Sequence, residues 1–355
     1  MVIDFEMKTI FSKDIEVDLK SCIDKIAADK VFILTDNNTQ QHCLPKIKSI
    51  VEDCYTDVIS IPSGDDNKNL TSLAQVWEFL TKNNASRKSL LINIGGGMIT
   101  DLGGFAASTF KRGIRYINIP TTLLSVVDAA TGGKTGINFC GLKNEIGVIN
   151  PAEFVLINVD FFKTLDENNL LSGFAEMIKH ALISNNENWK NILRFDLESF
   201  NLDALKPLLK DSLQVKEDIV TKDPKEENLR KALNFGHTFG HAFESLSYEQ
   251  QKPALHGFAV AWGMLCELYL SHAKLSFPKE NLLTYRQILK DFYGFYTINC
   301  KDYEQIFELM THDKKNESSK INFTLLSNIG EIKINQTATK DEIFEVLDFY
   351  REVAP

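Results

Sequence analysis

SLLINIGGGMITDLGGFAASTF, residues 89–110, runs from an apolar segment through three glycines into a segment with helical character. The apolar run 89–94 predicts a buried strand, and 100–110 predicts a helix with Asp101 in its first turn, where an acidic side chain suits the helix dipole. Glycines at such a junction let the backbone approach a phosphate, and the N–H groups of the helix point at the anion. The stretch therefore predicts an α/β fold with a candidate phosphate site at 95–97.

The glycine motif by itself leaves two interpretations open. Gly95 and Gly97 match the start of the dinucleotide fingerprint GxGxxG, but Thr100 stands where the third glycine is expected. A tight strand-to-helix turn without any ligand explains the same glycines equally well. Asp36, at the end of an earlier apolar run, is the kind of carboxylate that accepts hydrogen bonds from ribose hydroxyls.

Further apolar runs on both sides of this stretch extend the α/β pattern. They predict strands at 31–36, 58–62, 116–119 and 155–159, separated by helical stretches. Strand signals fade from about residue 167, and apolar residues at helical spacing follow, most clearly over 205–220. A chain of 355 residues exceeds one ordinary core, so we expect two domains that meet between residues 160 and 170.

Composition excludes several classes of protein. Hydrophobic residues make up 44% of the chain and charged residues 25%, which is typical of a globular protein. The net charge of −9 argues against general nucleic-acid binding. We expect no signal peptide, because the N-terminus has no basic region followed by an apolar one. We expect no membrane insertion, because the longest apolar stretch, 255–270, is too short for a bilayer and contains His256 and Glu267. Six cysteines without a CxxC pair indicate reduced thiols and predict a cytoplasmic protein.

A second polar segment follows the fourth predicted strand. Asp128 precedes TGGKTG, residues 131–136, and Lys143 and Asn144 come shortly after. A glycine-flanked lysine suggests a phosphate loop, but Asp128 occupies the position of the first glycine in GxxxxGK[ST], so we do not predict an ATPase. A flexible surface loop would explain the segment, and the clustered polar residues favour a binding loop.

Glu176, His237, His241 and His256 form a candidate metal group. In GHTFGH, residues 236–241, two histidines four residues apart lie on one face of a helix. A histidine on an apolar helix is usually a hydrogen-bonded core residue. Here three of the seven histidines occur within twenty residues and beside glycines, which favours metal binding. Three nitrogen or oxygen ligands and one open position describe a catalytic zinc site.

Five cations come from separate apolar or glycine-rich segments and suggest a phosphate or carboxylate site: Lys134, Lys143, Lys179, Lys216 and Arg230. Scattered, solvated lysines are the alternative. Lys216 lies on the apolar face of the helix predicted over 205–220. On its own it is better explained as a side chain at the edge of that face with its ammonium group in water, and otherwise as a cation directed into a pocket.

Taken together, the segments closely resemble the 3-dehydroquinate synthases, the sugar-phosphate cyclases of the shikimate pathway. The matching stretches occur in family order: GGGMITDLGGFAASTFKRG (95–113), IPTTLLSVVDAATGGKTGIN (119–138), LKNEIG (142–147), GFAEMIKHALI (173–183), LRKALNFGHTFGHAFE (229–244) and LHGFAVAWGM (255–264). The resemblance covers most of the chain from 31 to 330. GHTFGH alone would indicate only the wider superfamily that includes metal-dependent polyol dehydrogenases.

The resemblance implies an α/β protein with an N-terminal Rossmann-like NAD-binding domain, 1–165, and a C-terminal all-helical domain for zinc and substrate, 166–355. It implies Zn²⁺, with Co²⁺ as an alternative, on Glu176, His237 and His256. It implies these catalytic and substrate residues: Asp128, Lys134, Lys143, Asn144, Lys179, Lys216, Arg230, Asn234 and His241, which moves to the substrate phosphate. It implies these cofactor residues: Asp36, Asn38, Asp65, Lys68, Gly96, Gly97, Asp101, Thr121, Thr122, Asp128, Lys143, Phe161 and Thr164.

The implied reaction converts 3-deoxy-D-arabino-heptulosonate 7-phosphate to 3-dehydroquinate and phosphate. It proceeds by transient oxidation with NAD, elimination of phosphate, re-reduction and intramolecular aldol closure, so that NAD is regenerated in each turnover. The implied partners are the small-molecule sugar phosphate and a second copy of the chain, because Arg112 would reach the phosphate bound by the neighbouring subunit.

Three positions depart from the family pattern. Phe258 follows His256-Gly257 where many relatives carry an acid, which puts a hydrogen-bond partner of the metal site in doubt. Asp65 replaces a glutamate and shortens one expected cofactor contact. Ala129-Ala130-Thr131 replaces a run that contains serine.

Two other enzyme classes and a non-catalytic class compete with this interpretation. Sibling cyclases, such as 2-epi-5-epi-valiolone or deoxy-inosose synthases, typically alter several pocket positions, whereas Lys216, Arg230, Asn234 and His241 match the 3-dehydroquinate synthases. A metal-dependent polyol dehydrogenase would release NADH and need no phosphate cluster. A non-catalytic binding module would not need the metal ligands that this chain retains.

Overall fold

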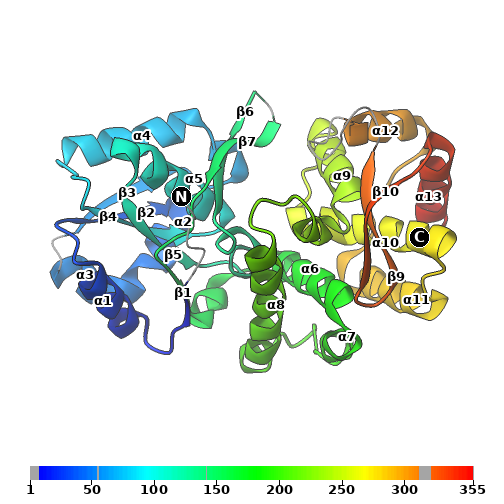
Figure 1. Cartoon of the computed structure of the whole chain (residues 1–355), viewed down its shortest axis with the longest axis horizontal. Coiled ribbons are helices and arrows are strands. Elements are labelled where there is room, and N and C mark those ends of the chain that lie inside the picture. The colour runs from blue at the N-terminus through cyan, green and yellow to red at the C-terminus, as the bar shows by residue number, and fades with distance from the viewer. Residues whose placement is uncertain (1–7, 54–55, 141, 312–320, 355) are drawn as a thin grey trace. The chain divides into compact units, whose positions relative to one another are not determined.

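The computed structural model describes residues 8–53, 56–140, 142–311 and 321–354, and the chain divides into two compact units, Met1–Asp166 and Glu167–Pro355 (Figure 1). The first unit is an α/β structure and the second is mainly helical, which confirms the predicted fold class. Among the described helices, none combines the length and the apolar character needed to cross a membrane.

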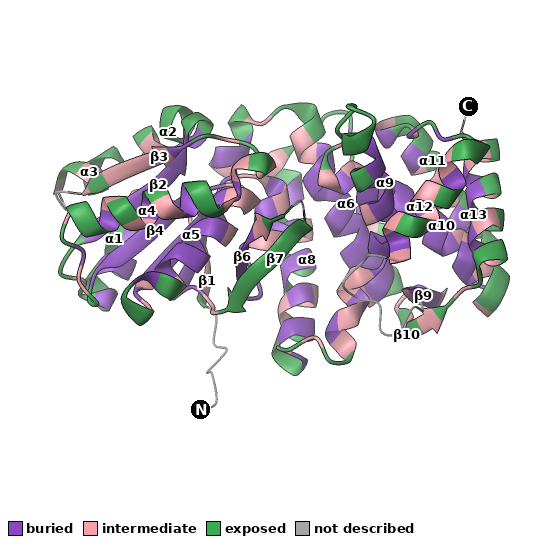
Figure 2. Ribbon diagram, turned by 90° about the horizontal axis from the view of Figure 1, so that it is seen from above, coloured by how far each residue is buried: buried purple, intermediate pink, exposed green. Residues whose placement is uncertain are grey.

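A six-stranded parallel sheet forms the centre of the first unit, in the order β1-β8-β5-β4-β2-β3. Its strands are β1 (Lys8–Phe11), β2 (Val31–Asp36), β3 (Asp57–Ile61), β4 (Leu90–Gly95), β5 (Arg115–Pro120) and β8 (Phe154–Ile157). All six residues of β2 and of β4 are buried, as expected for parallel strands covered on both faces (Figure 2). Five of these strands lie where the apolar runs predicted them. The short edge strand β1 was not predicted.

Helices and short turns connect these strands. The helices are α1 (Ile15–Ile26), α2 (Asn37–His42), α3 (Lys48–Asp53), α4 (Leu70–Lys82) and α5 (Gly97–Thr109). The 3₁₀ or π turns are Leu44–Ile47, Asp65–Asn67, Phe110–Arg112, Ser125–Ala129 and Val159–Thr164. Because α5 begins at Gly97, Asp101 lies in its second turn and not, as predicted, in its first.

Glycines let α5 lie directly on the sheet. A Cβ atom on Gly103 would overlap the side chain of Asn93 in β4, and one on Gly104 would overlap Thr135. In the dinucleotide fingerprint the third glycine permits such close helix–strand packing. Here Gly103 has that role, one turn after Thr100, so the missing glycine of the motif does not prevent the packing that the motif requires.

The segment predicted as a polar loop after β5 is largely an antiparallel hairpin, β6 (Lys134–Phe139) with β7 (Leu142–Ile149). The loop interpretation is wrong for these residues. Gly136 and Gly147 pair across the hairpin, and a Cβ atom on either would press against the opposite backbone. All eight residues of β7 are exposed. The strand therefore has no buried face, and a buried face is what produces the alternating apolar pattern that predicts a strand.

The second unit is built from eight helices within its described residues: α6 (Glu167–Ser184), α7 (Asn186–Leu193), α8 (Leu202–Lys222), α9 (His237–Glu249), α10 (His256–Leu275), α11 (Lys279–Ile288), α12 (Tyr303–Thr311) and α13 (Lys340–Val353). Short turns occupy Leu229–Asn234, Leu289–Tyr293 and Cys300–Asp302. The expectation of an entirely helical domain needs one correction, the antiparallel hairpin β9 (Asn322–Asn328) and β10 (Glu331–Thr337).

The core of the second unit is α10, which packs against α6, α9, α11, α13 and β9. Glycines bring three of these helices into backbone contact. Gly263 of α10 lies against Gly236 and Gly240 at the start of α9, and Gly257 of α10 lies against Ser172 of α6. These close approaches place the amino-terminal ends of α9 and α10 beside the middle of α6.

Candidate functional site

Glu176, His237 and His256 meet where α6, α9 and α10 come together. Each residue offers one ligand atom, and these atoms lie within 4.8 Å of one another. The Nε2 atom of His237 lies 3.5 Å from Oε1 of Glu176, and Nε2 of His256 lies 3.7 Å from the same oxygen. His237 and His256 are the first residues of their helices, so the glycine contacts that bring the helices together also bring the ligands together.

Both imidazole rings are oriented through their Nδ1 atoms. Nδ1 of His237 is 3.1 Å from the carbonyl oxygen of Phe235, and Nδ1 of His256 is 3.2 Å from Oε2 of Glu244. Such contacts fix a metal-binding histidine with its Nε2 atom directed at the ion. Glu244 thus gives His256 the acidic partner that Phe258 had put in doubt. Glu244 lies two helical turns after His237 on α9, and its contact with His256 forms only where α9 packs against α10.

Glu176 is a fully buried carboxylate in a cluster of cationic and titratable groups. Its Oε2 atom forms an ion pair with Lys179, and its Oε1 atom has no hydrogen-bond partner among the described residues. Burial alone would raise the pKa of Glu176, but Lys179, then His237 and His256, hold it well below its ordinary value of 4.5. A buried anionic oxygen aimed at two imidazole nitrogens fits a divalent cation of the zinc type.

The charge of His256 depends on the same neighbours. Burial lowers its pKa, whereas Glu244 and Glu176 raise it, and the result is a rise from 6.5 to about 10. In the metal-free protein the ring therefore carries a proton at neutral pH. A metal ion must displace that proton on binding, because only the neutral imidazole is a ligand.

His241 lies beside this triad but outside the group of close ligand atoms. Its ring centroid is 5.3 Å from that of His237 and 6.0 Å from that of His256. The spacing of the histidines left open whether His241 is a ligand. The structure brings Glu176, His237 and His256 together and places His241 next to them.

Three of the predicted cations are buried in this unit, namely Lys179, Lys216 and Arg230. Lys216 is only 4% exposed, which favours the interpretation of a cation directed into a pocket over that of a side chain at the edge of a solvated face. Nη1 of Arg230 donates to the carbonyl of Pro224 at 2.8 Å. Nearby in sequence, Nδ2 of Asn234 donates to Glu226, also at 2.8 Å. Buried cations in an acidic chain suit an anionic ligand.

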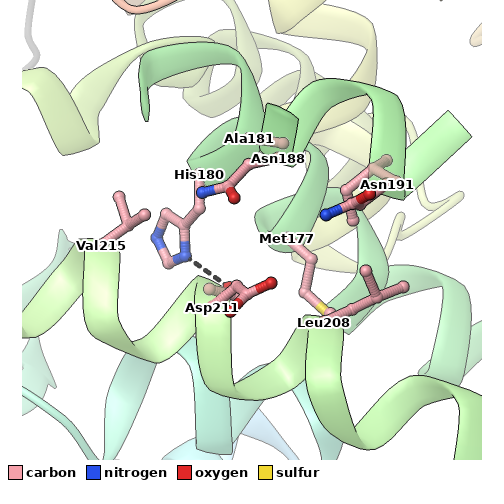
Figure 3. Close-up of a pocket in the computed structure, with 10 residues that line it drawn as sticks. Met177, His180, Ala181, Asn188, Asn191, Leu208, Asp211 and Val215 are labelled. Atoms are coloured by element: carbon pink, nitrogen blue, oxygen red, sulfur yellow. Dashed lines mark hydrogen bonds between the residues drawn. The ribbon is translucent and has the colours of Figure 1, made fainter. Parts of the chain in front are cut away.

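A hydrogen bond ties the helix of Lys179 to the helix of Lys216. Nδ1 of His180 in α6 lies 2.8 Å from the hydroxyl of Ser212 in α8, both are buried, and they line a small pocket among α6, α7 and α8 (Figure 3). Ser212 precedes Lys216 by one turn. The contact fixes the register of α6 against α8 and so the places of the two lysines.

In the first unit, most of the predicted cofactor residues follow the carboxyl ends of strands. Asp36 ends β2, and Gly96, Gly97 and Asp101 follow β4. The remaining members follow β3, β5 or β8: Asp65, Lys68, Thr121, Thr122, Asp128, Phe161 and Thr164. The carboxyl edge of a parallel sheet is where α/β proteins bind nucleotides. Gly95 accepts a hydrogen bond from the N–H of Thr121 at 2.9 Å, which joins two of these turns.

The start of α5 is closely packed against the turn after β5. A Cβ atom on Gly96 would lie 3.2 Å from the Thr122 side chain, and one on Gly97 would lie 3.2 Å from Ala129. Asp36 has a structural role, since its Oδ1 atom accepts the N–H of Thr39 at 2.8 Å and caps α2. Asn38 is the second residue of that helix.

A chain of ion pairs crosses this edge. Nζ of Lys68 is 3.1 Å from Asp101 and 3.6 Å from Asp65, and Asp65 is 3.3 Å from Lys143 in β7. Burial raises the pKa of Asp101 from 3.8 to about 6 against the opposing effect of Lys68. Burial lowers the pKa of Lys68, but Asp101 and Asp65 raise it above its ordinary value. Asp65 therefore has ion-pair partners despite its short side chain.

Three predicted residues lie elsewhere in the first unit. Lys134 begins β6 and is exposed, and Asn144 in β7 has a left-handed backbone with φ of 51°. Arg112 is exposed and precedes β5, at the opposite edge of the sheet from the cofactor residues. Lys111, Arg112 and Gly113 have successive positive φ values of 49°, 69° and 112°, so the backbone leaves the path of the helix before it at this turn.

The sequence of this chain matches family models and individual proteins of one family. A family model for the 3-dehydroquinate synthase N-terminal region matches residues 58–172, and one for the C-terminal region matches 173–316. A 3-dehydroquinate synthase from Parabacteroides distasonis is 53% identical over 98% of this chain and 98% of its own length. One from Clostridium tetani is 36% identical over 90% of this chain and 85% of its own length.

Solved structures of other enzymes share the fold. A 2-epi-5-epi-valiolone synthase from Streptomyces hygroscopicus, bound to NAD⁺ and Zn²⁺, has a TM-score of 0.85 at 22% identity and covers 99% of this chain and 98% of its own. A 2-deoxy-scyllo-inosose synthase with carbaglucose-6-phosphate, NAD⁺ and Co²⁺ has a TM-score of 0.83 at 22% identity, with coverages of 98% and 96%. An iron-containing alcohol dehydrogenase reaches 0.69 at 15%, with 98% of each chain covered. At these identities the likeness shows the fold alone.

Proposed function

Because the chain belongs to the 3-dehydroquinate synthase family, we propose a division of its chemistry between the two units. Its function is that of the family, the conversion of 3-deoxy-D-arabino-heptulosonate 7-phosphate to 3-dehydroquinate and phosphate in the shikimate pathway. Since a carbon–oxygen bond breaks as phosphate leaves, we assign the enzyme to the carbon–oxygen lyases. We further propose that it works in the cytoplasm.

Glu176, His237 and His256 are the proposed ligands of a Zn²⁺ ion. The observation that carries this assignment is the buried Oε1 atom of Glu176, which faces two imidazole nitrogens whose rings are oriented by Phe235 and Glu244. When bound, the ion would supply a Lewis acid that polarises an alcohol of the substrate. The same ligands suit Co²⁺, so both ions belong in the test.

We assign NAD to the carboxyl edge of the six-stranded sheet in the first unit. The N–H groups at the start of α5, beside Gly96 and Gly97, suit a pyrophosphate, and Asp36 suits a ribose hydroxyl. The other proposed contacts are Asn38, Asp65, Lys68, Asp101, Thr121, Thr122, Asp128, Lys143, Phe161 and Thr164. When bound, the cofactor would accept a hydride from the substrate and return it later.

We assign the phosphate group of the substrate to four residues of the second unit, the buried Lys216 and Arg230 and the partly exposed Asn234 and His241. Desolvated cations interact more strongly with a phosphate than exposed ones, and they stabilise the charge that develops as it departs. Lys179 is held beside Glu176 and would bind substrate oxygens near the metal. From the first unit we assign Asp128, Lys134 and Asn144 to the substrate as well.

We propose a homodimer in which Arg112 serves the partner's substrate. Within its own unit, Arg112 lies at the amino edge of the sheet, away from the cofactor residues at the carboxyl edge. An exposed arginine in a left-handed turn suits bidentate binding of a phosphate on another molecule. Two measurements test this role. Sedimentation at the enzyme concentrations used in assays gives the oligomeric state, and the activity of Arg112→Ala mixed with an inactive second variant shows whether the two subunits share a site.

The sibling cyclases remain the second candidate, since two of them share the fold. The deciding experiment uses metal-stripped protein supplied with NAD. The protein is given either the heptulosonate phosphate or the substrates of the sibling cyclases, each with and without Zn²⁺ or Co²⁺. Phosphate release from the heptulosonate phosphate alone, abolished by a chelator and restored by metal, is the expected result. Release only from another sugar phosphate, or oxidation of a simple polyol with accumulating NADH, would refute the assignment.

A further inference from the structure

Glu267 is a fully buried carboxylate in α10 that belongs to none of the sites described above. In the sequence it interrupts an apolar stretch, and burial of an ionised carboxylate is costly unless hydrogen bonds or opposite charges stabilise it. The position of this side chain in the fold supplies such stabilisation.

The carboxylate of Glu267 accepts hydrogen bonds from the backbone on both sides of His237. Its Oε2 atom accepts the N–H of Gly236 at 2.6 Å, and its Oε1 atom accepts the N–H of Thr238 at 3.0 Å. These N–H groups lie at the start of α9, where no carbonyl of the same helix can accept them. A carboxylate is also favoured at this end of a helix by the helix dipole.

Glycine at the helix start explains why the acceptor comes from another helix. Gly236 is the residue before α9, has a φ of 82°, and offers no side chain to cap the helix. A Cβ atom there would collide with Met264 and press against the carbonyl of Val260, both in α10. The close packing that requires glycine thus removes the usual capping side chain, and Glu267 of the same α10 replaces it.

We propose that Glu267 is a positioning residue for the metal ligand His237. It connects the backbone around His237 to α10, whose first residue is His256, so one carboxylate fixes the position of one ligand relative to the helix of another. The peptide groups Phe235–Gly236 and His237–Thr238 cannot rotate without breaking a buried hydrogen bond to Glu267. This inference rests on the proposed metal site formed by Glu176, His237 and His256.

Glu267→Gln tests the role with little change of shape. The amide keeps one acceptor oxygen and turns an NH₂ group toward the other backbone N–H, so one of the two hydrogen bonds is lost. The affinity of metal-stripped, full-length protein for Zn²⁺ should fall on the order of 10-fold, as is typical when a residue behind the ligands is changed. Competition with a chromogenic chelator measures the affinity, and the visible spectrum of the Co²⁺ form reports ligand geometry.

Ser271→Ala is the matched control in the same helix. Ser271 is fully buried one turn after Glu267, and its hydroxyl accepts the N–H of Leu326 at 3.0 Å. The hydroxyl also donates to the backbone carbonyl of Glu267 at 2.6 Å. The substitution therefore removes two buried hydrogen bonds from α10 but none from the start of α9. A variant that merely loosens the core should therefore lower thermal stability while leaving the Zn²⁺ affinity and the Co²⁺ spectrum as in the wild type.

Weaker Zn²⁺ binding and an altered Co²⁺ spectrum in Glu267→Gln, with wild-type values in Ser271→Ala, would support the proposal. Equal affinity in Glu267→Gln and wild type, or an equal loss in both variants, would overturn it while leaving the metal site intact. A wild-type protein that binds no Zn²⁺ would overturn the metal site, and this proposal with it. If Glu267→Gln does not fold, Glu267→Asp, whose carboxylate is one methylene shorter, enters the same comparison.

Discussion

The carboxyl edge of the sheet in the first unit differs in construction from the helix junction of the second, where α6, α9 and α10 bring Glu176, His237 and His256 together. At the sheet edge, glycines and strand ends present backbone groups, and the nearby charges of Lys68, Asp101 and Asp65 are paired with each other. At the helix junction, side chains carry the chemistry, and Glu176 and Lys179 are almost wholly buried. The first site is a property of the fold, whereas the second depends on a few side chains.

This difference determines how each region responds to mutation. Burial of a charge is stabilised only while its partners stay in place, so removal of one member of a buried pair is expensive. Exposed pairs contribute little, because water screens them and their side chains are mobile. We therefore expect the largest effects at the buried pair of Glu176 and Lys179 and small ones at exposed pairs, and the following variants test that ranking.

Glu176→Gln should have the largest effect. It removes the anionic ligand and leaves the buried ammonium of Lys179 without its ion-pair partner, so we expect loss of bound Zn²⁺, turnover at background, and destabilisation of about 3–5 kcal/mol. Metal analysis, phosphate release and denaturant unfolding measure these effects. Asp160→Asn breaks the exposed pair with Lys163 and should change the free energy of unfolding by less than about 1 kcal/mol. Similar losses in both variants would contradict the ranking.

Lys216→Met should fold and lose turnover. If the buried ammonium stabilises the departing phosphate, its removal should lower kcat by about 10²- to 10³-fold, the range seen when one such donor is lost. Circular dichroism checks the fold, and steady-state kinetics give kcat and KM. Lys210→Met, at an exposed position of the same helix, is the control and should keep full activity. Full activity in Lys216→Met would leave this lysine a structural role only.

Glu244→Gln should weaken the metal site without destroying it. The carboxylate of Glu244 lies within hydrogen-bond distance of Nδ1 of His256. Loss of such a partner of a metal ligand lowers metal affinity by about 10- to 100-fold. Excess Zn²⁺ should then restore most of the activity. Glu249→Gln, exposed at the end of the same helix, provides the comparison. Unchanged affinity in Glu244→Gln would mean that His256 does not need the carboxylate.

Asp101→Asn should give the smallest effect, visible as a dependence on pH. Because burial raises the pKa of Asp101 from 3.8 to about 6, its contribution to stability is full below its unfolded value and is lost as pH rises through about 6. The melting temperature of Asp101→Asn minus that of the wild type should therefore become more positive between about pH 4.5 and about pH 7.5. Asp57→Asn, at an exposed carboxylate, controls for general effects, and a difference that is flat over this range would exclude the shift.

The sheet was predictable where strands are buried on both faces. The runs that became β2, β4 and β5 are continuous and end at a charged residue, glycine or proline, so their positions follow from hydrophobicity and turn chemistry. The hairpin β6–β7 was missed because β7 is exposed along its length and resembles a polar loop. Its pairing depends on Gly136 meeting Gly147, a contact that spacing along the chain does not encode.

The metal group was predictable as a set of residues, but its geometry was not. Histidines four residues apart indicated a site, yet the choice among His237, His241 and His256 depends on helix approaches set by Gly240, Gly257 and Gly263. Glu244 and Glu267 were missed because their roles exist only after α9 and α10 pack together. A carboxylate in an apolar helix is the sequence signal that points to such buried partners.

The central claim is that this chain uses NAD as a catalyst and not as a consumed substrate. The most direct measurement supplies zinc-loaded enzyme with an excess of the heptulosonate phosphate and with less NAD than enzyme, and counts the phosphate released. Many phosphates should be released for each NAD, with no accumulation of free NADH. Release that stops after one phosphate for each NAD, or a steady rise of NADH, would contradict it.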